Sequence, residues 1–269
     1  MVQRQGIAMW AAIAFMALFM PALLLLSRPC AAQGVRTKIN PRDGARMVFI
    51  PAGAFLMGGT SYPDEKPPHK VYLDGYWIYQ TPVTVAQYRT FCEATKHEMP
   101  FLPEGEGRGD HPIVNVTWSD AQAYCAWAGM SLPTEAQWEK AARGTDGREY
   151  PWGNEWDKSR CQASRKDVFD GGSTVSVGSL ASGASPYGVL DMEGNVAEWC
   201  ADWYAETYYR SAPDKNPTGP EKGTDRVVRG SPWFGNLSFA YRAANRNMAD
   251  PHRGLDCLGF RCVCRVASR

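Results

Sequence analysis

The stretch LPTEAQWEKAARG, residues 132–144, carries a complete set of signals for one short helix. Thr134 is followed three residues later by Gln137, the spacing at which two side chains satisfy the first backbone N–H groups of a helix. Trp138 then lies on the face that can pack against a core, and Gly144 suits the left-handed conformation that ends many helices. The stretch therefore predicts a helix that is capped at both ends.

Outward from this stretch, two more segments carry helix-start signals. Thr84 with Gln87, and Ser119 with Gln122, repeat the capping-box spacing. Gly129 follows the second of these segments and is expected to stop its helix. Three short helices are therefore expected upstream of residue 145.

The rest of the chain is dense in residues that interrupt regular structure, with 26 Gly and 19 Pro among 269 residues. Residues 71–79 and 258–266 have the β-branched and aromatic composition of strands. Gly and Pro at this density break long helices and strands, so aromatic side chains must supply much of the core. We expect an α+β domain of short helices, short strands and much irregular but packed chain.

The first 32 residues indicate a targeting segment. Arg4 precedes an apolar run over residues 7–26, and small residues end at Ala32, where a signal peptidase would cleave. The alternative is an uncleaved anchor, because this run is long enough to span a bilayer. The domain is thus expected in the periplasm or secreted, or held at the membrane by residues 7–26. Residues 33–46 are polar, lack periodicity and are expected to be a linker before a domain over residues 47–266.

Charge and cysteine content limit the possible functions of the exported part. Removing Arg4 and Arg28 from the formal net charge of +1 leaves −1, which gives no reason to expect nucleic acid as a partner. Export permits disulfides, and the odd number of remaining cysteines leaves at least one thiol without an internal partner. Their pairing cannot be read from the sequence. These seven cysteines are Cys92, Cys125, Cys161, Cys200, Cys257, Cys262 and Cys264.

Several ordered segments resemble one known family. They are MVFIPAGAFLMG (47–58), DEKPPH (64–69), HPIVNVTW (111–118), LPTEAQWEKAARG (132–144), YPWGN (150–154), YGVLDMEGNVAEW (187–199) and LGFRC (258–262). Together they resemble the family of the formylglycine-generating enzyme, or sulfatase-modifying factor. The resemblance spans residues 47–265 and implies a variant of the C-type-lectin fold that is poor in regular secondary structure.

The family contains both enzymes and non-enzymes. It includes the copper-dependent oxidase that converts a sulfatase cysteine to formylglycine, iron sulfoxide synthases, a periplasmic factor of pyoverdine maturation and a paralogue without the catalytic cysteines. The resemblance therefore implies the fold more firmly than the function.

The segment RGSPWFGNLSFAYR, residues 229–242, departs from the oxidase where its chemistry resides. The oxidase binds copper(I), a soft ion that thiolates suit, with two nearby cysteines. Gly235 and Ala240 occupy those positions here, and neither offers a metal ligand. Copper is therefore not expected. Iron is left open, although this chain has no room for the separate histidine-rich bundle of the sulfoxide synthases.

Three further family positions in the same pocket also differ, at Pro232, Ala197 and Cys257. Arg and Trp side chains are suited to gripping an extended partner, so a remodelled pocket is expected here. Its candidate residues are Trp233, Asn236, Ser238, Arg242, Asn245, Arg246 and Cys257. Two alternatives stay open, namely that Arg242 and Arg246 form internal ion pairs, and that Cys257 is structural or disulfide-bonded.

The loop over residues 191–198 matches the family's calcium site. The carboxylates of Asp191 and Glu198 can converge with backbone carbonyls of Gly194 and Val196, and calcium prefers such oxygen ligands. A structural calcium ion is expected there, and the alternative is a cation-free loop held by hydrogen bonds.

Three functional hypotheses follow. The first is an accessory or binding protein for a secreted protein, peptide or small molecule. The second is an oxidative maturation enzyme with non-cysteine chemistry, like the pyoverdine factor, which would make the protein an oxidoreductase. The third, a formylglycine-generating oxidase that acts on sulfatases, is disfavoured by Gly235 and Ala240.

Overall fold

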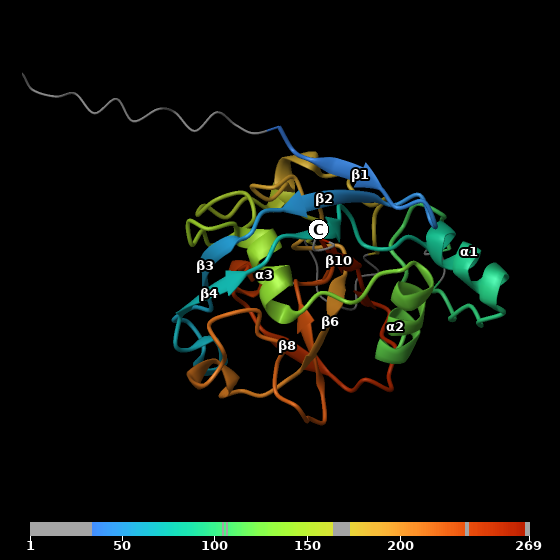
Figure 1. The fold of residues 1–269 in the computed structure, drawn as a ribbon. Coiled ribbons are helices and arrows are strands. Elements are labelled where there is room, and N and C mark those ends of the chain that lie inside the picture. Colours follow the sequence, from blue (N-terminus) through green and yellow to red (C-terminus); the bar gives the residue numbers. More distant parts are fainter. Residues whose placement is uncertain (1–33, 104, 106, 164–172, 235–236, 267–269) are drawn as a thin grey trace, which may run out of the picture. The chain divides into compact units, whose positions relative to one another are not determined.

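The computed structural model describes residues 34–103, 105, 107–163, 173–234 and 237–266. Its helices are α1 (Val85–Thr95), α2 (Trp118–Trp127) and α3 (Glu135–Arg143). Its strands are β1 (Thr37–Ile39), β2 (Arg46–Ile50), β3 (Gly53–Met57), β4 (His69–Leu73), β5 (Tyr76–Tyr79), β6 (Ala197–Trp203), β7 (Arg226–Arg229), β8 (Asn247–Ala249), β9 (Leu258–Gly259) and β10 (Val263–Arg265). Irregular chain and short 3-10 turns fill much of the rest (Figure 1), so the expected α+β fold with little regular structure is confirmed.

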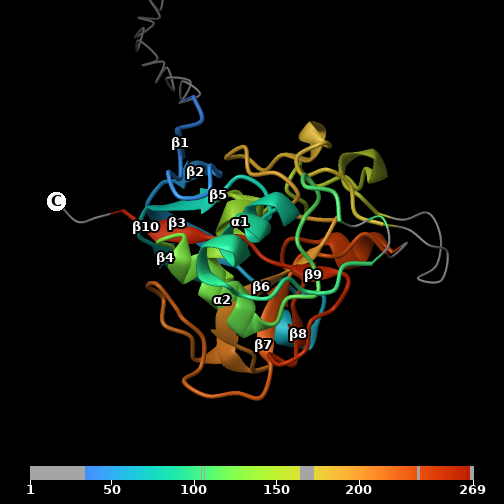
Figure 2. The same ribbon diagram turned by 90° about the vertical axis from the view of Figure 1, so that its right-hand side faces the viewer.

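The strands form three small sheets (Figures 1 and 2). One has the order β1-β2-β5-β10, a second joins β3 to β4, and a third has the order β8-β7-β6-β9. Most pairs are antiparallel, but β6 runs parallel to β9, and its pairing with β7 is irregular between Trp199 and Trp203. The third sheet brings the residue 191–198 loop, which leads into β6, next to the chain that follows β7.

Two of the three expected helix starts are confirmed. Thr84 caps α1 and Thr134 caps α3, each with the reciprocal bonds of a capping box. The expectation for α2 was wrong by two residues, because its cap is Thr117 paired with Asp120. The Asp120 carboxylate accepts both the backbone N–H and the hydroxyl of Thr117, so Ser119 lies inside the first turn. Gly129 follows α2 with a φ of 71°, as expected of a helix stop.

Three expectations about the strands and the linker need correction. Residues 71–79 are not one strand, because Asp74 and Gly75 separate β4 from β5, which belong to different sheets. Residues 258–266 are likewise divided into β9 and β10, which also belong to different sheets. The segment expected to be a linker contains β1, which pairs with β2 through Lys38 and Met47, among other residues. A polar, exposed edge strand lacks the alternation that marks a half-buried strand, so local pattern missed it.

The first sheet separates two hydrophobic clusters. Met47 and Tyr79 face the cluster that includes α1 and α2, whereas Val48 and Ile78 face the cluster that includes α3. This alternation follows from the two-residue period of a strand. Among the described residues, all buried members of the hydrophobic clusters fall between residues 45 and 263. Within the described ranges, no helix has the length and apolarity to cross a membrane.

Candidate functional site

A pocket of about 540 Å³ lies beside the loop that follows β7. Its lining includes Tyr62, Asp64, Ser231, Pro232, Phe234, Phe239, Ala240 and Asn245. The rings of Tyr62 and Phe239 lie 6.2 Å apart and form an aromatic wall, while Asp64 and Asn245 supply polar groups. The pocket therefore combines apolar contact area with a few hydrogen-bonding groups, as ligand sites commonly do.

One of the two residues that the sequence resemblance matches to the oxidase cysteines lies within the described part of the chain. Ala240 lies in the 3-10 turn Ser238–Tyr241 and lines this pocket with a methyl group. Gly235 and Asn236 lie outside the described residues. The alanine side chain carries no group that can bind a metal ion.

The other candidate residues are only partly brought together. Asn245 and Arg246 line the pocket. Trp233 is 8% exposed and donates its backbone N–H to the carbonyl of Asn195. It is not itself among the lining residues, but its ring lies 5.1 Å from that of the lining residue Phe234. Ser238 begins the 3-10 turn and is half-buried.

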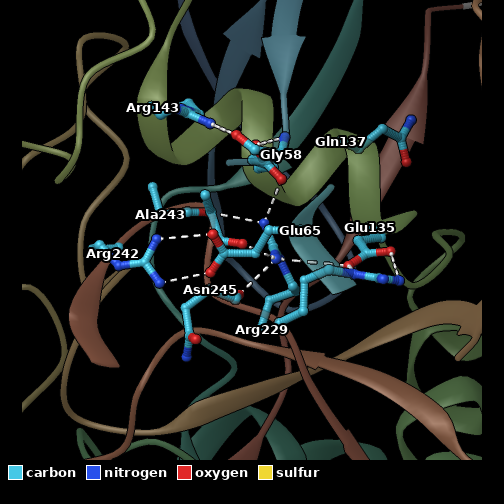
Figure 3. Close-up of polar contacts among 12 residues, drawn as sticks. Gly58, Glu65, Glu135, Gln137, Arg143, Arg229, Arg242, Ala243 and Asn245 are labelled. Carbon is cyan, nitrogen blue, oxygen red and sulfur yellow. Dashed lines mark hydrogen bonds and ion pairs between the residues drawn. The ribbon is translucent and has the colours of Figure 1, made fainter. Parts of the chain in front are cut away.

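Both arginines left open by the sequence form internal ion pairs, as Figure 3 shows for Arg242. Arg242 donates to the two carboxylate oxygens of Glu65 at 3.0 and 2.6 Å. Arg246 donates to those of Glu135 at 2.7 and 2.9 Å. Burial would raise the pKa of Glu135, but Arg246 and then Arg229 hold it below its usual value. The ion-pair alternative is confirmed, so neither guanidinium is free to grip a partner.

A third buried arginine supports the chain around the pocket. Arg229 donates to Glu139 at 2.6 Å and to the carbonyls of Ala243 and Asn245 at 2.8 and 2.6 Å (Figure 3). Its side chain has no exposed area. Because these bonds connect β7 and α3 to the chain that precedes β8, they position Asn245 in the pocket wall.

Glu193 is a buried acid immediately behind the pocket. Its Oε2 accepts the backbone N–H of Ser231, a lining residue, at 3.1 Å. Its Oε1 has no hydrogen-bond partner among the described residues. Burial raises the pKa of Glu193 to about 8, despite the opposing effect of Arg229. The carboxyl therefore holds its proton at neutral pH, and a protonated acid can donate one.

Cys257 is not among the residues that line the pocket. Its carbonyl accepts the N–H of Ala197 at the start of β6, and its thiol is half-buried. Burial, followed by the charge of Asp256, raises the pKa of this thiol to about 12. A protonated thiol is a poor nucleophile and a poor metal ligand at neutral pH.

The predicted calcium loop contains an internal cation. Arg261 donates to both oxygens of Glu198, at 2.7 and 2.6 Å, and to the carbonyl of Asp191 at 3.1 Å. Glu198 also accepts the indole N–H of Trp138. Burial raises the pKa of Asp191, and the nearby charge of Glu198 raises it further. The residues fit calcium in part, because Asp191 would gain from a cation while Glu198 is already bound to Arg261.

Sequence reasoning missed the acidic partners of the arginines. Glu65 and Glu135 lie 177 and 111 residues from Arg242 and Arg246. The sequence offered one local indication of these pairs, namely charged residues within otherwise apolar or tightly turned segments. Charged side chains in such segments tend to be buried, and buried charges are normally paired. Glu193, in the middle of the calcium loop motif, was also missed as a separate acid.

Comparison with known proteins agrees with this architecture. The model of the sulfatase-modifying factor enzyme 1-like domain matches residues 34–266. A formylglycine-generating enzyme from Streptomyces coelicolor is 34% identical over 87% of this chain and 94% of its own. The mouse protein called inactive C-alpha-formylglycine-generating enzyme 2 is 31% identical over 90% of this chain and 92% of its own. The solved structure of PvdO from Pseudomonas aeruginosa has a TM-score of 0.73 and 29% identity, covering 86% of this chain and 98% of that one. The chain belongs to the family of the sulfatase-modifying factor enzyme 1-like domain, which includes the formylglycine-generating enzymes.

Proposed function

We propose that this protein is an exported accessory protein that binds a peptide segment of a secreted partner in the pocket beside Ala240. The observation that carries the proposal is an open pocket with an aromatic wall, at the place where the family's oxidase needs a thiolate. The pocket keeps the features of a binding site, while Ala240 supplies no copper ligand. A relative of similar length that is named inactive supports a role without formylglycine synthesis.

The lining chemistry favours an extended peptide over a compact polar metabolite. Tyr62, Phe234 and Phe239 provide aromatic surface for side-chain contacts. Asn245 provides an amide that can donate to and accept from a peptide backbone. The buried Arg229 donates a hydrogen bond to the backbone carbonyl of Asn245. This part of the pocket wall is therefore ordered before a partner binds, which lowers the entropic cost of binding.

Selection from a displayed library of random peptides tests binding. We expect wild-type protein to enrich a sequence family whose members bind it in solution, and Phe239→Asp to weaken that binding at least about tenfold. Phe101→Asp is the matched control, because Phe101 is 82% exposed on the loop after α1 and outside the lining. Equal loss in both variants, or no enrichment by wild type, would count against the proposal.

The second candidate is an oxidative maturation enzyme with non-cysteine chemistry. Its specific support is Glu193, a proton-bearing acid that contacts the backbone of the pocket residue Ser231. Oxygen consumption in the presence of the selected peptides distinguishes the two candidates, with Glu193→Gln as the test of this acid. Uptake by wild type that is lost in the variant would favour the enzyme.

Copper(I) titration tests the third candidate. We expect no tight stoichiometric binding at this pocket, because residue 240 is an alanine. Tight binding that Phe239→Asp disturbs would reverse the inference from the missing thiol and restore formylglycine synthesis as a candidate.

A further inference from the structure

One face of the first sheet concentrates positive charge over aromatic rings. Arg36 lies 4.3 Å from the ring centre of Phe49, and the Lys38 ammonium lies 4.6 Å from that of Trp77. The two rings are themselves 5.2 Å apart. We call the surface made by Arg36, Lys38, Arg42, Phe49 and Trp77 the basic sheet face.

The charge on this face has little local compensation. Residues 34–46 contain four basic residues and one acidic residue, Asp43. The basic residues are Arg36, Lys38 and Arg42, which belong to the face, and Arg46. The Asp43 carboxylate accepts hydrogen bonds from the hydroxyls of Tyr79 and Tyr124, both at 2.6 Å, and is thereby directed towards the core. The domain as a whole is close to neutral, so this surface is a local excess of positive charge rather than a reflection of the overall composition.

Apolar groups accompany the charges. Ile39, next to Lys38 on β1, is 54% exposed. A pocket of about 390 Å³ opens beside it, and Lys38, Arg42, Met47 and Met130 are among its lining residues. Such a mixture of exposed apolar groups with Lys and Arg suits the boundary between lipid headgroups and acyl chains. The methylene stems of Lys and Arg can contact the acyl chains there, while their charged ends bind headgroup phosphates.

The position of the face in the chain points to the same partner. The apolar run ends at residue 26, and seven residues, 27–33, separate it from Gly34. Seven extended residues reach at most about 25 Å. While the run is in a bilayer, whether as a signal peptide before cleavage or as an anchor, the basic sheet face is therefore confined near the membrane surface.

We propose that the basic sheet face docks on anionic phospholipid, with Arg36, Lys38 and Arg42 on headgroup phosphates and Ile39 at the acyl boundary. Basic residues near a membrane each add to its attraction for anionic lipid, and this attraction weakens with salt. The docking surface is separate from the peptide pocket proposed above, and each proposal can fail alone.

Vesicle co-sedimentation of the chain that begins at Gln33 tests the proposal without the apolar run. This chain contains every buried member of the hydrophobic clusters among the described residues, so we expect it to fold. We expect binding to phosphatidylcholine vesicles that contain phosphatidylglycerol, and little binding to phosphatidylcholine alone. The triple variant Arg36→Glu/Lys38→Glu/Arg42→Glu should bind at least about tenfold more weakly.

A matched control separates local recognition from net charge. The variant Lys70→Glu/Arg89→Glu/Lys222→Glu changes the net charge equally at exposed positions outside the face, and should bind nearly as well as wild type. Thermal melting shows whether both variants are folded. Equal loss in the two variants, no binding by wild type, or binding to duplex DNA in preference to anionic vesicles would each overturn the proposal.

Discussion

At the scale of single residues, buried ion pairs hold the chain around the pocket in place. Arg242 and Glu65 have side chains that are 6% and 0% exposed, and they bond through both guanidinium branches. A buried pair adds little net stability when complete, but the loss of one partner leaves an uncompensated charge in the interior. Such pairs act as structural restraints on the pocket rather than as ligand contacts.

Single and double variants of this pair should therefore differ in stability. Arg242→Met should lower the free energy of unfolding by about 3–5 kcal/mol, because Glu65 stays buried without its cation. The double variant Glu65→Gln/Arg242→Met should recover some of that loss, as urea unfolding would show. Arg148→Met is the control, since its partner Asp146 is 58% exposed and the loss of this pair should matter by less than about 1 kcal/mol. A double variant no more stable than Arg242→Met would contradict the explanation.

Glu193 makes stability depend on pH in a defined direction. Its pKa of about 8 in the folded protein lies above the value near 4.3 of an unfolded glutamate. Between these values the folded state holds a proton that the unfolded state has lost, so stability falls as pH rises through this window and levels above it.

Glu193→Gln should therefore flatten the decline in unfolding free energy between pH 5 and pH 8.5 by a few kcal/mol. A second decline should remain, because burial also raises the pKa of Asp202 to about 8. Urea titrations across this range measure both effects, with the exposed Glu155→Gln as control. An unchanged slope in Glu193→Gln would show that the carboxyl is ionised in the folded state.

At the scale of elements, the start of α2 shows how a cap is chosen. Thr117 and Ser119 are both hydroxyl residues that could cap this helix. Thr117 is the cap, because the Asp120 carboxylate accepts hydrogen bonds from both its backbone N–H and its hydroxyl. We expect Thr117→Ala to lower the unfolding free energy by about 1 kcal/mol and Ser119→Ala to lower it by less. Denaturant titration distinguishes the two, and the reverse order would restore the start expected from the sequence.

The residue 191–198 loop is the element on which the metal prediction depends. We expect calcium to raise the melting temperature, because a cation would relieve the repulsion between Asp191 and Glu198. Asp191→Asn should remove this response, while an exposed control such as Asp214→Asn should keep it. An unchanged melting temperature after verified removal of metal would favour Arg261 as the only cation that the loop requires.

At the scale of the whole molecule, distant elements place two thiols in contact. The sulfur atoms of Cys125 on α2 and Cys262 before β10 lie 3.1 Å apart, and both residues are fully buried. We expect an oxidising compartment to join them, with the two thiols giving up two protons and two electrons to a disulfide donor. Their separation of 137 residues makes the bond a long-range constraint on the unfolded chain.

Peptide mapping of oxidised protein should find these two cysteines linked, and the variant Cys125→Ser/Cys262→Ser should be less stable by about 3–5 kcal/mol under oxidising conditions. Cys92→Ser serves as the control that leaves the link intact. Recovery of both residues as alkylated free thiols from oxidised, denatured protein would contradict the pairing.

The sequence by itself determined the family, two of the three helix starts, and the absence of a thiol at residue 240. These features depend on ordered local motifs, on side chains that bond within a few residues of themselves, and on residue identity. Only the tertiary structure decided that Arg242 and Arg246 are internally paired, that Asp74 and Gly75 separate strands of different sheets, and that Glu193 lies behind Ser231. The physical reason is distance along the chain. Glu65 meets Arg242 across 177 residues, and such a contact depends on how whole elements pack rather than on any pattern near either residue.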